Sequence, residues 1–203
     1  MAMLAAGAVE QALLVAREST LAWSPVAAGF HVQHLYIARL EASAALLQGR
    51  PEEARARLDA LWPDLERSML LRVPITRIDA LGLRARVSVA CAAAGAKDRR
   101  RLLALASRDA SILVAERRED ARAWGLLIRG GVAMCEGRPG GQELGLAAEI
   151  FEAQGMRVAA ACAAWQGGLH EERLNTVLSE CGVASPTAWA RLLAPGLSGP
   201  SRR

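Results

Sequence analysis

Apolar side chains recur at intervals of three and four residues along almost the whole chain. In one such run Ile78, Leu81, Ala85 and Val89 fall on a single stripe, whereas Arg84 falls outside it. This spacing is typical of an amphipathic helix that buries one face, and no pair of segments reads as strands. The pattern predicts an all-α protein with helices at about residues 3–18, 27–48, 51–67, 74–94, 98–117, 119–136, 141–154, 156–168, 171–181 and 186–194.

Glycine and proline mark the ends of these helices. Gly49-Arg50-Pro51 places glycine where a helix can end in the left-handed conformation and proline at the first position of the next helix. Gly137-Arg138-Pro139 repeats this arrangement. Both segments predict turns of helical hairpins. Because proline clashes with the preceding turn of a helix, we expect a kink or a break near Trp62, which precedes Pro63.

The turns recur at a nearly constant interval. Four glycines that each precede a predicted second helix are 42, 46 and 42 residues apart: Gly7, Gly49, Gly95 and Gly137. Because a helical hairpin exposes apolar surface that only its neighbours can cover, this period indicates a stacked array. We therefore predict a right-handed α-solenoid of antiparallel, tetratricopeptide-like hairpins over residues 1–197, with a disordered tail at 198–203. A globular helical bundle with accidental spacing is the alternative.

Composition and charge narrow the classes of partner. Of 25 basic residues only one is lysine, and 21 acidic residues are interleaved with them for a net charge of +4. Because the longest uniformly basic run is Arg99-Arg100-Arg101, we expect no nucleic-acid partner. The longest uncharged apolar stretch, 87–96, is about half as long as a bilayer requires, and residues 1–16 lack a basic leader. We expect a cytoplasmic protein that does not enter a membrane.

No residue pattern indicates catalysis. The cysteines lack the paired spacing of a zinc site and lie among small neighbours typical of core thiols: Cys91, Cys135, Cys162 and Cys181. His31 and His34 share a helix face without a nearby third ligand. A helix-turn-helix at 177–193 is disfavoured because its second helix offers only Arg191 as a basic contact, and we expect this segment to cap the last repeat. We expect no enzyme activity, no cofactor and no metal.

Several short motifs resemble the C-terminal region of large bacterial serine/threonine protein kinases. They are Phe30-His31-Val32-Gln33-His34, Leu61-Trp62-Pro63, Ser68-Met69-Leu70-Leu71-Arg72-Val73, Arg77-Ile78-Asp79-Ala80-Leu81, Glu149-Ile150-Phe151-Glu152-Ala153 and residues 185–196. The resemblance covers about residues 20–197. In that family a kinase domain and a nucleotide-binding ATPase module precede helical repeats with a sensing or scaffolding role. The chain lacks the kinase and phosphate-loop motifs, so the resemblance implies a regulatory signalling role and no catalytic residue.

Arginines on the first helices of the hairpins are the candidate binding residues. Arg77 and Arg84 are seven residues apart, as are Arg122 and Arg129, so each pair shares one helix face. First helices line the concave surface of tetratricopeptide-like solenoids, where a basic lining favours an acidic protein or peptide. We predict a non-catalytic protein-binding module; a salt-bridged, solvated face is the alternative for these arginines. The alternative functions are the repeat region of a signalling ATPase or LuxR-like transcriptional regulator, and an enzyme of unrecognised type.

Overall fold

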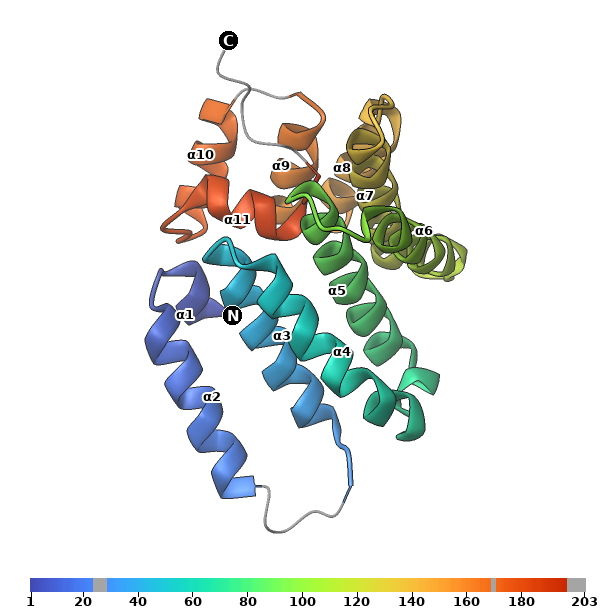
Figure 1. Ribbon diagram of the computed structural model, residues 1–203. Helices are drawn as coiled ribbons and strands as arrows, with labels where there is room; N and C mark the ends of the chain where they lie inside the picture. The colour runs from blue at the N-terminus through green and yellow to red at the C-terminus, as the bar shows by residue number, and fades with distance from the viewer. Residues whose placement is uncertain (24–28, 169–170, 197–203) are drawn as a thin grey trace.

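The structure is a computed structural model that describes residues 1–23, 29–168 and 171–196. Within these ranges all regular structure is helical (Figure 1), which confirms the all-α prediction. The elements are α1 (Ala2–Ala5), α2 (Val9–Trp23), α3 (Val32–Leu47), α4 (Pro51–Arg67), the 3-10 turn η1 (Leu70–Arg72), α5 (Pro74–Ala93), α6 (Arg99–Ala115), α7 (Glu119–Cys135), α8 (Gly141–Ala153), α9 (Arg157–Gln166), α10 (Glu171–Glu180) and α11 (Pro186–Leu193). The tail expected at 198–203 lies outside the described residues.

Glycines in the left-handed conformation follow α1, α3, α5, α7, α8 and α10. They have φ angles between 70° and 89°: Gly7, Gly49, Gly95, Gly137, Gly155 and Gly182. After α3 the N–H of Arg50 donates to the carbonyl of Ala45, and that of Gly49 donates to Leu46. This pair of bonds is a Schellman motif, and it recurs at each of these glycines. The predicted turns near residues 49, 95 and 137 are confirmed.

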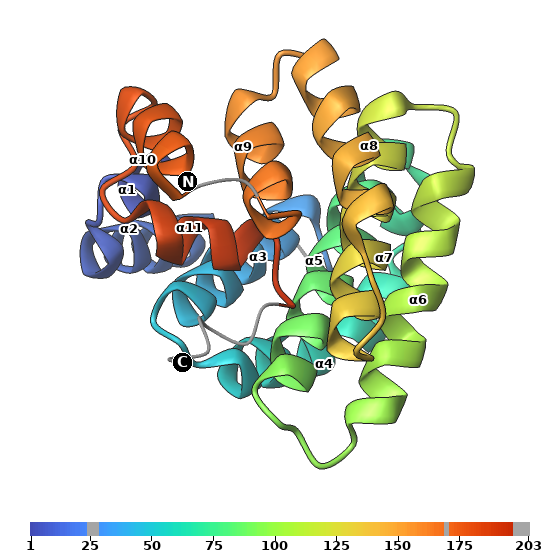
Figure 2. The same cartoon turned by 90° about the horizontal axis from the view of Figure 1, so that it is seen from above.

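Consecutive helices pack side by side, and alternate helices also meet. From α5 to α9 each helix contacts the next, and α5 additionally contacts α3 and α7 (Figure 2). The buried side chains form two large clusters, one from α3 to α7 and the other from α7 to α11 with contributions from α1 to α3. Because α3 and α7 each contribute to both clusters, these two helices connect the two parts of the core.

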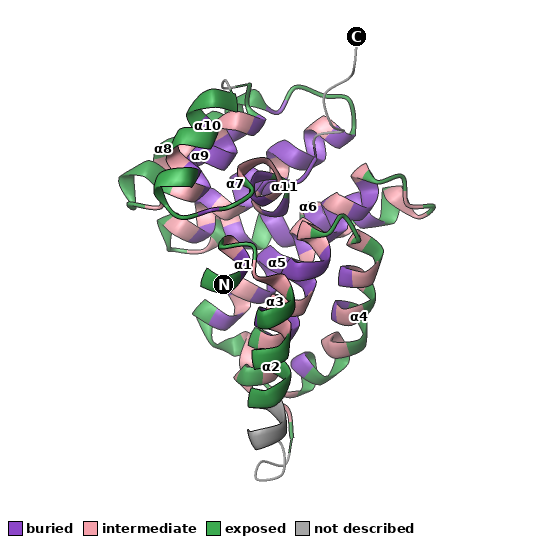
Figure 3. Ribbon diagram, turned by 90° about the vertical axis from the view of Figure 1, so that its left-hand side faces the viewer, coloured by how far each residue is buried: buried purple, intermediate pink, exposed green. Residues whose placement is uncertain are grey.

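The last helix returns to the N-terminal half of the chain. α11 contacts both α3 and α9, and Figure 1 shows it lying between the upper and lower helices. In the loop before α11, the N–H of Ala184 donates to the carbonyl of Ala5 at 2.8 Å. Trp189 and Leu192 are buried in this junction, whereas much of α2 is exposed (Figure 3). The segment expected to cap the last repeat therefore also contacts the first helices.

The kink or break expected near Trp62 is not a break, because α4 continues through Pro63 to Arg67. Pro63 and Asp59, whose carbonyl loses its helical donor, are both exposed, so the missing hydrogen bond is not buried. The first predicted helix, 3–18, is instead divided at Gly7 into α1 and α2, because the Schellman turn there stops α1 after one turn.

Three glycines let α7 approach its neighbours at backbone distance. A Cβ on Gly125 would lie 2.7 Å from the carbonyl oxygen of Ala110 in α6, and one on Gly130 would lie 2.6 Å from Leu144 in α8. A Cβ on Gly131 would lie 2.5 Å from the carbonyl oxygen of Pro195. Since these spacings exclude any side chain, the glycines are required by close packing and not by backbone conformation.

The turn and helix glycines predict opposite effects of the same substitution. Gly137→Ala should lower the free energy of unfolding by about 1 kcal/mol, because alanine is strained at positive φ. Gly145→Ala should raise it by about 0.5–1 kcal/mol, because this exposed position of α8 has open space for a methyl group. Urea unfolding followed by circular dichroism measures both. Equal effects of the two substitutions would contradict the assigned backbone conformations.

Candidate functional site

The candidate site is the face of α3, α5, α7 and α9 that carries α11 and residues 194–196. We call it the inner face, and residues 194–196 the closing segment, all of which is buried although it forms no helix. The segment is held from α9, where the Gln166 Nε2 donates to the carbonyl oxygen of Pro195 at 2.7 Å. From α7, the Cys135 thiol lies 3.9 Å from the carbonyl oxygen of Gly196. The inner face thus holds a short, irregular stretch of polypeptide through its backbone.

Two glycines allow this backbone to lie directly on α7. Gly196 has a φ of 128°, and a Cβ there would lie 2.8 Å from the Cα of Gly131. A Cβ on Gly131 would in turn meet the Pro195 carbonyl oxygen. Neither position accepts a side chain without displacing the segment. The fit therefore selects glycine on both sides of the contact.

Gln166 is the buried polar group of this contact. It is 3% exposed, and its Oε1 atom has no hydrogen-bond partner among the described residues. The amide orientation is fixed by the Pro195 carbonyl, because only the NH₂ end of the side chain can donate to it. A buried acceptor without a donor costs free energy. The contact therefore satisfies only the NH₂ end of the Gln166 amide.

A cluster of two arginines and one aspartate lies where α3, α5 and α7 meet. Arg39 pairs with Asp79 at 2.9 Å, and the Arg86 guanidinium lies over the Trp124 ring at 5.0 Å. Burial, with repulsion from Arg39, lowers the pKa of Arg86 to about 10, so its side chain remains charged at neutral pH. Among the described residues no carboxylate forms an ion pair with Arg86. Two positive charges and one negative charge leave the cluster at +1.

Arg77 and Arg84 are turned toward α6 and the residues that follow it. Arg77 donates to Glu116 at 2.6 and 2.8 Å. Arg84 forms two hydrogen bonds of 2.7 Å with Asp109, which is fully buried, and its guanidinium stacks 3.5 Å from the centre of the Trp62 ring. Arg84 therefore ties α4, α5 and α6 together.

Arg122 and Arg129 form weaker contacts on α7. Arg122 pairs with Glu119 of its own helix at 3.4 Å, and Arg129 donates to the Ser111 hydroxyl of α6 at 3.3 Å. The four predicted arginines thus make their polar contacts with neighbouring turns or with α6 and its flank. In none of these contacts do they meet the closing segment on the inner face.

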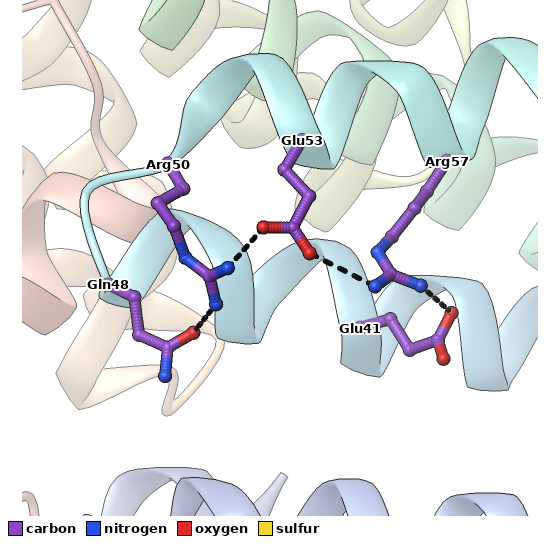
Figure 4. Close-up of polar contacts among 5 residues, drawn as sticks. All are labelled: Glu41, Gln48, Arg50, Glu53 and Arg57. Atoms are coloured by element: carbon purple, nitrogen blue, oxygen red, sulfur yellow. Dashed lines mark hydrogen bonds and ion pairs between the residues drawn. The ribbon is translucent and has the colours of Figure 1, made fainter.

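A second candidate site is the groove between α3 and α4. Its volume is about 850 Å³, and apolar side chains such as Phe30, Ile37 and Leu61 line it. Along one rim Arg57 pairs with Glu53 at 3.0 Å and with Glu41 at 2.9 Å, and Figure 4 shows these three side chains between α3 and α4. The same figure shows Arg50 bonded to Glu53 and Gln48. These paired charges fasten α4 to α3 and leave no set of converging reactive groups at this rim.

Three of the four cysteines are buried, and His34 forms part of the cap at the start of α3. Burial raises the pKa of Cys91 and Cys162 to about 12, and it also raises that of Cys135, so these thiols stay protonated near neutral pH. Cys181 is exposed at the end of α10, which corrects the expectation of a core thiol. His34 Nδ1 accepts the backbone N–H of His31 at 2.9 Å, within a capping box at the start of α3.

Two kinds of feature are absent from the part of the chain that the structure describes. No group of three histidine, cysteine, aspartate or glutamate side chains there has the arrangement of a metal site. No described helix combines the length and apolar character needed to cross a bilayer.

Comparison of the chain with models of protein families, with curated proteins and with solved structures finds no match. The chemistry of the inner face is therefore inferred from its residues. The sequence indicated neither Arg86 nor Gln166 as a binding residue, since neither belongs to a motif and Gln166 follows an alanine-rich run. The adjacent Gly130 and Gly131 in the middle of a predicted helix were the available signal, because glycine there indicates close approach of another backbone.

Loss of the buried ion pair should strongly destabilise the protein. Asp109→Ala should lower the free energy of unfolding by about 3–5 kcal/mol, because it leaves the Arg84 guanidinium without its carboxylate in a largely buried place. Arg122→Ala, which removes a partly exposed pair, should change it by less than about 0.5 kcal/mol. Chemical denaturation of both variants measures the difference. Similar values would show that Arg84 is solvated.

Thiol reactivity should separate Cys181 from the other cysteines. In native protein near pH 8 we expect a disulfide reagent such as dithionitrobenzoate to modify Cys181 alone, because the other thiols are buried and protonated. In guanidinium chloride all four should react. Cys181→Ser should abolish the native reaction, whereas fast native labelling of Cys162 would contradict the packing of α9.

Proposed function

We propose that the chain is a non-catalytic helical-repeat module that binds an extended segment of a partner protein on its inner face. In this proposal the hairpins form a right-handed, tetratricopeptide-like solenoid. The recurrence of one turn geometry and the contacts of α5 with both α3 and α7 support this arrangement. The resemblance of the sequence to the C-terminal region of bacterial serine/threonine kinases supports a regulatory or scaffolding role in the cytoplasm.

The observation that carries the proposal is the closing segment itself. Residues 194–196 lie on the inner face as irregular polypeptide, held by a hydrogen bond from a buried side chain to their backbone. Recognition through the backbone is how many peptide-binding domains gain affinity, with neighbouring pockets and charges adding specificity. A segment of another protein could be held by the same groups.

An acidic partner segment fits the charge of this face. The Arg39–Asp79–Arg86 cluster carries a net charge of +1, and Trp124 provides an apolar surface beside it. A carboxylate bound to Arg86 would complete the ion pair that the described residues leave open. Arg77 and Arg84 are less suited to this role, because Glu116 and Asp109 already neutralise them.

The function is tested with the full chain and a phage-displayed library of random dodecapeptides. We expect enriched peptides to contain acidic residues, and calorimetry should show that Arg86→Gln weakens their binding about tenfold or more. The reason is that a hydrogen bond to a charged group contributes about 1.5–3 kcal/mol. Arg129→Gln is the matched control, since it removes one positive charge from the side of α7 that contacts α6.

The two variants and the library separate the possible failures. Loss of binding in Arg129→Gln but not in Arg86→Gln would place the peptide on the predicted arginines and contradict the inner-face site. A library that yields no binding peptide would contradict the peptide-binding function. Circular dichroism of each variant confirms that the fold is retained.

A further inference from the structure

The contact between α9 and the closing segment lacks one of its two possible hydrogen bonds. A glutamine carboxamide has a donor end and an acceptor end, and both can pair with one residue of an extended peptide. Such a residue presents its N–H and its C=O toward the same side, as in the paired positions of an antiparallel ladder. Gln166 uses its donor end on the Pro195 carbonyl, while Oε1 remains without a partner among the described residues.

Residue 195, which accepts the hydrogen bond from Gln166, is a proline. Proline has no N–H, so this residue cannot donate back to Gln166. Any other residue at this position would carry a backbone N–H. The chain thus places on its own inner face a segment that satisfies the buried glutamine only in part.

We propose that residues 194–196 are a displaceable internal ligand. In this proposal the Gln166 subsite is built for an extended partner peptide with a non-proline residue followed by glycine. This inference rests on the proposed peptide-binding function and specifies its ligand. Glycine follows because any Cβ at the position of Gly196 would lie 2.8 Å from the α7 backbone at Gly131.

The proposal has a consequence for affinity. A partner must first displace the internal segment, so its apparent affinity is the intrinsic affinity multiplied by the fraction of molecules in which the face is free. Because the partner supplies a hydrogen bond that Pro195 cannot, it gains over the internal segment at this subsite. Proline at residue 195 keeps the internal ligand weaker than the partner it imitates.

The test adds the missing donor to the internal segment. In the full chain, Pro195→Ala supplies the backbone N–H that proline lacks. We expect this new amide at position 195 to exchange with solvent at least about tenfold more slowly than the same amide in the Gln166→Met, Pro195→Ala double variant. We also expect peptides selected on the unaltered chain to bind Pro195→Ala about threefold to tenfold more weakly, which corresponds to one neutral hydrogen bond.

A matched substitution controls for the flexibility gained when proline is removed. Pro139→Ala alters an exposed turn between α7 and α8 and should leave peptide affinity within about twofold of the unaltered chain. Equal exchange rates of the position-195 amide in the single and the double variant would overturn the inference, as would equal affinity of peptides for Pro195→Ala and the unaltered chain. Slow exchange together with a library that yields no peptide would overturn the proposed function instead, because the exchange measurement needs no partner.

Discussion

The close backbone packing around α7 is the constraint on which the rest of the structure depends. Gly125 admits α6, Gly130 admits α8, and Gly131 admits the closing segment. A glycine inside a helix lowers stability by about 1 kcal/mol relative to alanine. Three glycines in one helix therefore indicate that the short distance between α7 and its neighbours, and not helix propensity, determines which residue can occupy these positions. Because α7 belongs to both large core clusters, a larger residue at any of these positions would shift one half of the molecule against the other.

Charge is used mainly to join helices. Arg84 is held between the Trp62 ring and the buried Asp109, and Arg77 and Arg57 cross to other elements in the same way. An arginine-rich composition therefore does not produce a uniformly basic surface, since each of these guanidinium groups has a carboxylate close by. Arg86 differs from them, because none of the described carboxylates forms an ion pair with it and its guanidinium lies over the Trp124 ring.

The closing segment connects the architecture with the proposed function. α11 and residues 194–196 complete the core of α3, α7 and α9, and the same residues cover the surface on which a partner peptide would bind. In this proposal the module is stable without its partner because it supplies a substitute from its own chain. Binding then becomes an exchange of one segment for another, in which small differences in hydrogen bonding decide the outcome.

The sequence by itself determined the helices and their turns. Helix ends were predicted to within a few residues at most positions because the Schellman turn at Gly49, Gly95 and Gly137 depends on local backbone preference. Only the tertiary structure decided which residues of different helices contact one another. Asp109 lies 25 residues from Arg84, and Pro195 lies 29 residues from Gln166, so neither pairing leaves a local signal. Such contacts depend on how the helices stack in three dimensions, which periodicity along the chain does not encode.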